Sequence, residues 1–82
     1  MKIIKYNDIK NIAGPIIREL RIENGLSQKQ LAEKMQLLGV GITRKEISKI
    51  ENNNRLIQDF ELFAFAEIFK VSADVFSKNF KI

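Results

Sequence analysis

The 82-residue sequence contains no cysteine and no histidine. This absence excludes disulfide bonds, thiolate chemistry, zinc sites with Cys or His ligands, and imidazole acid–base catalysis. A metal site would need carboxylates alone, and the ten acidic residues lack the spacing of a calcium-binding loop. The four glycines stand singly or as a close pair, so the sequence has no glycine-rich phosphate loop. We therefore expect neither an enzyme nor a bound metal or cofactor.

Long hydrophobic runs are also absent. No apolar stretch approaches the roughly 18 residues that a membrane-spanning helix needs, and residues 1–8 lack the features of a signal peptide. We therefore expect a cytoplasmic protein with no membrane partner. Apolar residues make up 45% of the chain and are spread along its length, which predicts one globular domain with a modest core.

Acidic residues are outnumbered by basic ones, 10 to 14. The positive excess lies in residues 1–21 and 43–55, whereas the chain from Leu56 onward is slightly acidic. Such polarity is typical of a domain that presents one face to phosphates. The surplus by itself would suit an ordinary solvated surface equally well.

Proline occurs once, and Pro15 lies where a first helix would begin. Asn24 and Gly25 are typical of the end of that helix. Two capping boxes follow, at residues 27–30 and 43–46, and each predicts the first turn of a further helix.

Asp59 is expected to open a fourth helix, and residues 72–74 a short fifth one. Residues 8–82 show no alternation long enough to predict a sheet. The predicted fold class is therefore all-α, with a five-helix domain over residues 11–82. Residues 1–10 are expected to form an N-terminal arm or a short strand.

Apolar residues at helical spacing give the expected inner faces. Those of the third and fourth helices are Ile47 and Ile50, then Leu62, Phe63, Ala66 and Phe69.

With Ile47 and Ile50 inside, a period of 3.6 residues places basic and hydroxyl side chains on the outer side of the third helix. Arg and Lys can donate to guanine O6 and N7, and Ser suits either kind of group in the major groove of DNA. In a lone helix, this pattern is more often an ordinary solvated face. The expected base contacts are Thr43, Arg44, Lys45, Ser48 and Lys49.

Neighbouring segments favour the DNA interpretation. Gln28 and Lys29 lie in the first turn of the second helix, where backbone N–H groups attract a phosphate. Residues 52–55 offer amide and guanidinium donors directly after the third helix, although asparagines also suit a plain turn. The expected phosphate contacts are Gln28, Lys29, Asn52, Asn54 and Arg55.

Residues 26–35 with Arg21, residues 47–52 and residues 62–72 resemble the phage-repressor/Cro-like (XRE-type) family of helix-turn-helix regulators. The resemblance covers roughly residues 12–77. It implies a five-helix, lambda-repressor-like bundle in which the helix near Thr43 reads bases and Gln28 contacts phosphate. It also implies that Arg44, Lys45 and Lys49 face base edges. Arg21 and Glu51 match a structural ion pair between the first and third helices.

The connection before Thr43 departs from the family pattern. Seven residues separate Met35 from Thr43, where the family has about two and the ordinary turn is three or four residues long. We expect the second helix to run through Leu38 and a loop over residues 39–41 to return the chain. The apolar residues Leu37, Leu38, Val40 and Ile42 would then widen the core.

Two functions are compatible with these features. The first is a sequence-specific transcriptional regulator, a repressor, that binds double-stranded DNA as a homodimer with half-sites about 34 Å apart. The candidates for its dimer surface are Phe76, Phe80 and Ile82, and the alternative for these three residues is a place in the core. The alternative is a protein-interaction module, such as an antitoxin or antirepressor, that uses the C-terminal aromatic residues or the arm over residues 2–10. A steep loss of affinity with salt would favour the DNA-binding function.

Overall fold

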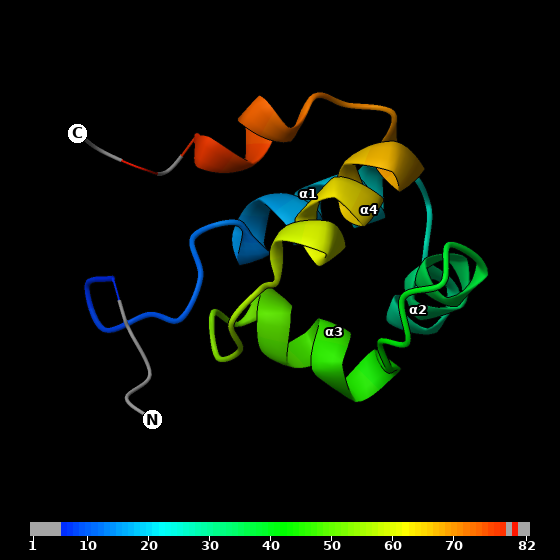
Figure 1. Cartoon of the computed structure of the whole chain (residues 1–82), viewed down its shortest axis with the longest axis horizontal. Coiled ribbons are helices and arrows are strands. Elements are labelled where there is room, and N and C mark those ends of the chain that lie inside the picture. The colour runs from blue at the N-terminus through cyan, green and yellow to red at the C-terminus, as the bar shows by residue number, and fades with distance from the viewer. Residues whose placement is uncertain (1–5, 79, 81–82) are drawn as a thin grey trace.

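The computed structural model describes residues 6–78 and 80. Its elements are α1 (Gly14–Glu23), α2 (Gln28–Leu37), α3 (Arg44–Glu51), α4 (Asp59–Phe69) and the 3-10 helix η1 (Ala73–Ser77) (Figure 1). Within these residues the fold is all-helical, and the only β-type pairing is an isolated bridge between Tyr6 and Ile9. This confirms the expected all-α class.

The predicted fifth helix is a 3-10 helix rather than an α-helix. Ser72 caps it by accepting a hydrogen bond from the Asp74 N–H at 3.4 Å, and the element is only five residues long. The tighter 3-10 form is ordinarily found in such short pieces. Residues 1–5 of the predicted arm or strand lie outside the described residues.

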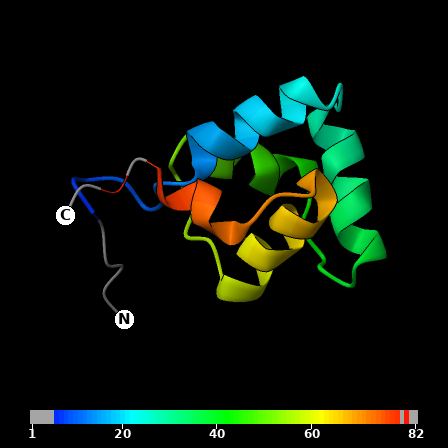
Figure 2. The ribbon, with the colours of Figure 1, turned by 90° about the horizontal axis from the view of Figure 1, so that it is seen from above.

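α1 and α4 lie on opposite sides of α3, as the view from above shows (Figure 2). α2 packs against both α3 and α4. The two predicted capping boxes are present, at Ser27–Gln30 and Thr43–Glu46, so α2 and α3 begin where the sequence places them. The largest fully buried side chains come from all four α-helices and the connection before α3: Ile17, Leu31, Met35, Ile42, Ile47, Ile50 and Phe65.

The close approach of α1 to α3 depends on Gly14. A Cβ atom at this position would overlap the carbonyl oxygen of Ile50. Asn11 fixes the same junction, because its side chain accepts from the Gly14 N–H at 2.8 Å and donates to the Ile50 oxygen at 3.1 Å. The C-terminal end of α3 is thereby attached to the start of α1.

The connection between α2 and α3 contributes fewer buried side chains to the core than expected. Ile42 is buried and Val40 is partly buried, but Leu37 and Leu38 are 86% and 48% exposed, so the prediction that both leucines widen the core was wrong. α2 ends at Leu37, two residues beyond the buried Met35, and this spacing turns Leu37 toward solvent. Gly39, with a φ of 83°, then reverses the chain.

The structure corrects the prediction for Phe63 and decides between the two alternatives for Phe76. Phe63 is 62% exposed, because the phase of α4 is set by the buried Glu61, Phe65 and Phe69 at four-residue intervals. Phe76 is buried, so it is a core residue and not part of a free dimer surface. Phe80 is exposed, and Ile82 lies outside the described residues.

No helix in the described part of the chain is long and apolar enough to cross a membrane.

Candidate nucleic-acid interface

Capping geometry fixes the first turn of α3. The Thr43 Oγ1 accepts from the Glu46 N–H at 3.2 Å, and Glu46 Oε1 accepts from the Thr43 N–H at 3.0 Å. The Thr43 hydroxyl also donates to Glu46 Oε1 at 3.1 Å. Its proton is therefore used inside the capping box, so the exposed side chain offers its methyl group and one acceptor lone pair, but no donor.

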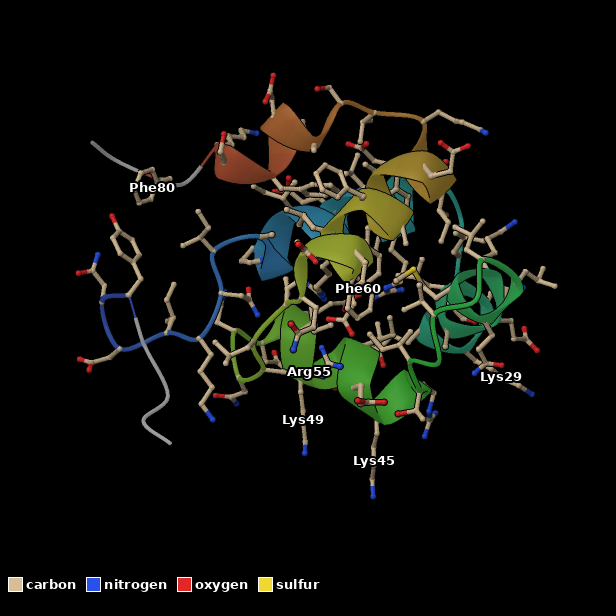
Figure 3. The ribbon with its side chains drawn as sticks, in the orientation of Figure 1. Lys29, Lys45, Lys49, Arg55, Phe60 and Phe80 are labelled. Carbon is tan, nitrogen blue, oxygen red and sulfur yellow. The ribbon has the colours of Figure 1, made fainter. Side chains whose placement is uncertain are left out.

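The two sides of α3 differ sharply. Ile47 and Ile50 are completely buried, whereas Arg44, Lys45 and Lys49 are exposed. Ser48 is half-buried. Lys45 and Lys49 point away from the helical bundle in the same direction (Figure 3). Within residues 6–78, no carboxylate forms an ion pair with any of the three exposed cations.

Arg21 and Glu51 form an ion pair that joins α1 to α3. The Arg21 Nε lies 2.6 Å from Glu51 Oε2, and Arg21 Nη2 donates to Oε1 at 3.1 Å. A third donor of Arg21 reaches the Leu26 carbonyl at 2.8 Å. The side chains are only 13% and 2% exposed, and the hydrogen bonds to Glu51 hold the pKa of Arg21 above its ordinary value.

Gln28 is attached to this ion pair. Its side-chain N–H donates to Glu51 Oε1 at 3.1 Å, which fixes the amide at the first turn of α2. Lys29, the next residue, is exposed at the same helix end, well to the side of Lys45 in the view of Figure 3.

Arg55 has a role in the fold that the sequence did not indicate. Its two terminal nitrogens donate to the two oxygens of Glu61 at 2.8 and 2.9 Å, and Nη2 also reaches Glu46 at 3.1 Å. The guanidinium therefore ties the first turn of α3 to α4. Both terminal nitrogens donate within the protein, which argues against the predicted phosphate contact.

Glu61 is a buried carboxylate that sequence reasoning missed. Burial raises its pKa, but the hydrogen bonds from Arg55 and from the Gln58 N–H at 2.9 Å outweigh burial and hold the pKa below 4.5. The pKa of Glu46 is also lowered, chiefly by the hydrogen bond from the Thr43 N–H. The available sequence signal for Glu61 was its position three residues after the cap of α4, which is the second position of a capping box.

The asparagine run after α3 is partly a structural turn. Asn53 has a φ of 62°, and its side chain donates to the Asn11 carbonyl oxygen at 2.9 Å. The Asn52 side chain donates to the backbone carbonyl oxygen of Ser48 at 3.0 Å. The Asn54 side chain is exposed and has no hydrogen-bond partner among the described residues.

A polar hollow lies where α1, α2 and the end of α3 meet. It brings together the predicted residues Gln28 and Asn52 with Arg18, an exposed residue of α1 that we had not predicted. The signal for Arg18 was its position one helical turn before Arg21, on a neighbouring part of the same helix surface. Glu19 and Glu51 also line the hollow, together with Pro15.

A family profile described as helix-turn-helix matches residues 17–76, which is well over half of the chain and includes α2 and α3. No curated protein and no solved structure matches the chain. This family consists of DNA-binding regulatory domains and is not an enzyme family. The chain therefore belongs to the phage-repressor/Cro-like (XRE-type) helix-turn-helix family and is a DNA-binding transcriptional regulator.

Proposed function

We propose that this regulator is a sequence-specific repressor that inserts α3 into the major groove of DNA. The observation that carries the proposal is the contrast among its cations. Arg21 and Arg55 are bound to carboxylates, whereas Arg44, Lys45 and Lys49 on the solvent side of α3 have no ion-pair partner within residues 6–78. A short helix held by its buried face and presenting free cations suits base-edge recognition.

The base contacts come from the outer side of α3. Arg44, Lys45 and Lys49 would donate to guanine O6 and N7, and Ser48 would contact either kind of base group. Thr43 would contribute its methyl group, which can pack on the methyl of thymine, because its hydroxyl proton is used by Glu46.

The phosphate contacts flank α3. Gln28 is oriented by Glu51 and has a second N–H left for a phosphate oxygen, and Lys29 lies beside it at the positive end of the α2 dipole. The remaining proposed phosphate contacts are Arg18 on α1 and Asn52 and Asn54 directly after α3. Arg55 is left out, since its donors hold Glu46 and Glu61.

A homodimer on a two-fold symmetric operator gives such a domain useful affinity, since one α3 reaches only a few base pairs. Repression follows from occupancy alone, because a protein bound in the groove blocks the same DNA to other proteins.

The test is to measure binding to a selected operator and to a random duplex by fluorescence anisotropy. Arg44→Ala and Lys45→Ala should weaken operator binding by about 10- to 100-fold and random-duplex binding much less, since a good base contact discriminates by about 1–3 kcal/mol. Lys78→Ala is the matched control: Lys78 follows η1, on the side of the bundle away from α3 (Figure 1), and its loss should change neither.

Salt provides the second readout. Affinity should fall steeply between about 50 and 200 mM salt. Equal losses on both duplexes would contradict base reading by α3. An affinity that does not respond to salt would favour the protein-interaction alternative.

A further inference from the structure

The solvent side of α4 carries two large aromatic side chains. Phe60 and Phe63 are 58% and 62% exposed and lie one helical turn apart. The opposite side of α4 holds the buried Ala64, Phe65 and Phe69. The solvent side of a helix in a globular protein is ordinarily polar, and exposed apolar patches often mark an interaction site. We call Phe60 and Phe63 the α4 aromatic face.

DNA is a poor partner for this face. Helix α4 contains no Lys or Arg, and the exposed residues that border the two phenylalanines are the acidic Asp59 and Glu67. Asp59 accepts a hydrogen bond from the N–H of its neighbour Phe60 at 2.7 Å, and Glu67 contacts Lys70 at 3.5 Å. An apolar centre with an acidic edge would repel phosphates, and it suits a protein surface with an apolar centre.

The position of this face relative to α3 indicates which protein. In Figure 3, Lys45 and Lys49 point out of the bundle to one side, and Phe60 lies on α4, away from that side. Figure 2 shows α4 displaced from α3 along the direction of view of Figure 1, which is the shortest axis of the molecule. A helix lying in the major groove crosses the duplex axis, so the next half-site lies to one side of α3, toward either α1 or α4. The α4 aromatic face lies on one of these two sides (Figure 2).

The dimensions fit two copies. The shortest extent of the molecule is 19 Å, and α3 lies between α1 and α4 along it. With half of an interhelical spacing of about 10 Å added to that extent, every part of one copy lies within about 24 Å of a two-fold axis through the α4 face. The roughly 34 Å between successive major grooves needs each α3 about 17 Å from that axis, which lies within this range.

We propose that the α4 aromatic face is the contact between two copies of this chain, with Phe60 and Phe63 packing across a two-fold axis. The proposal deepens the proposed function, since it uses the placement of α3 on DNA. Two partly exposed phenylalanines are few compared with the roughly 800 Å² that each partner contributes to a standard interface. The dimer is therefore weak in free solution and becomes stable on a palindromic operator.

A thiol cross-link tests the contact without DNA. The chain has no cysteine, so Glu67→Cys introduces a single thiol beside the aromatic face and keeps both phenylalanines. Glu33→Cys is the matched control, since Glu33 is an exposed glutamate of α2 outside this face. With a short bis-maleimide, Glu67→Cys should give covalent dimer about tenfold faster than the control, and adding Phe60→Ser with Phe63→Ser should remove the difference.

Equal rates for Glu67→Cys and Glu33→Cys, or a difference that survives loss of both phenylalanines, would overturn the proposal. The DNA arm separates it from the proposed function. Phe60→Ser with Phe63→Ser should retain wild-type affinity for a single half-site and lose about tenfold or more on the full palindrome. If Glu67→Cys cross-links faster than Glu33→Cys but the protein binds all DNA sequences equally, the base-reading role of α3 is contradicted and the dimer interface is supported. Unchanged affinity of the double variant for the palindrome would remove the interface and keep the reading role.

Discussion

The two sides of α3 use the same kinds of charged residue for different purposes. Glu51, at the C-terminal end of α3, holds Arg21 in a short and largely buried ion pair, and Glu46, in its first turn, contacts Arg55 in a partly exposed one. On the outer side, Arg44, Lys45 and Lys49 are exposed and lack such contacts within residues 6–78. The comparison indicates that two carboxylate-bound arginines fix the helix so that three other cations remain available to a ligand.

The largest effect should follow from breaking the inner side at Arg21. Arg21→Ala leaves the Glu51 carboxylate, which is 2% exposed, with Gln28 as its remaining hydrogen-bond donor. We expect the free energy of unfolding to fall by about 3 kcal/mol, measured by urea denaturation. Arg18→Ala, an exposed arginine of the same helix, is the control and should change stability by less than about 0.5 kcal/mol. A similar small change for both variants would show that the ion pair is not needed for the fold.

Arg55 should have the next largest effect. Arg55→Ala removes both hydrogen bonds to the buried Glu61 and the link to Glu46, and we expect a loss of about 2 kcal/mol in urea denaturation. Arg44→Ala is the control on the outer side, and it should keep full stability. If Arg55→Ala is as stable as the wild type but binds all DNA more weakly, Arg55 contacts phosphate after all.

Some of the contacts that hold α3 in place could be predicted from the sequence, and others could not. The Arg21–Glu51 pair came from a family resemblance, and the two capping boxes came from local spacing, so both were accessible before the fold was known. The Arg55 contacts were not, because Glu46 and Glu61 lie on two different helices, and only the folded chain brings both within reach of Arg55. A basic residue after an asparagine run looks the same whether it meets a phosphate or a carboxylate.

The phase errors have a similar physical cause. Leu37 and Phe63 are apolar, and apolarity alone placed both in the core. The structure exposes them because a helix has one buried side, and in α4 that side is chosen by Glu61, Phe65 and Phe69. A glutamate in the buried row cannot be recognised from hydrophobic periodicity, since its burial depends on Arg55.

Acid should weaken the Arg55 contacts. The pKa values of Glu46 and Glu61 are below the ordinary 4.5 in the folded protein, so the unfolded chain takes up protons first as the pH falls. Their contribution to stability is complete above about pH 4.5 and is lost as the pH drops through the lowered folded values. Thermal unfolding at a series of pH values should show this loss in the wild type, and a smaller one in Arg55→Ala. Identical pH profiles would contradict the assignment.

The smallest effect is expected at Gln28, which donates to the buried Glu51 and is also a proposed phosphate contact. Gln28→Ala removes one donor to Glu51 and one proposed phosphate contact, so affinity should fall by a few-fold on every DNA sequence, in line with about 1 kcal/mol for one hydrogen bond. Lys78→Ala, which follows η1, should leave DNA affinity unchanged. Loss of affinity on the operator alone would instead make Gln28 a base-reading residue.

Selection of bound sequences from random duplex DNA tests the central claim most directly. The account predicts one enriched, two-fold symmetric motif with half-site centres about 10 base pairs apart. It also predicts that Arg44→Ala and Lys45→Ala change the preferred bases within each half-site and leave the spacing unchanged. A wild-type protein that enriches no motif, or variants that select the same bases as the wild type, would contradict the account that the outer side of α3 reads DNA.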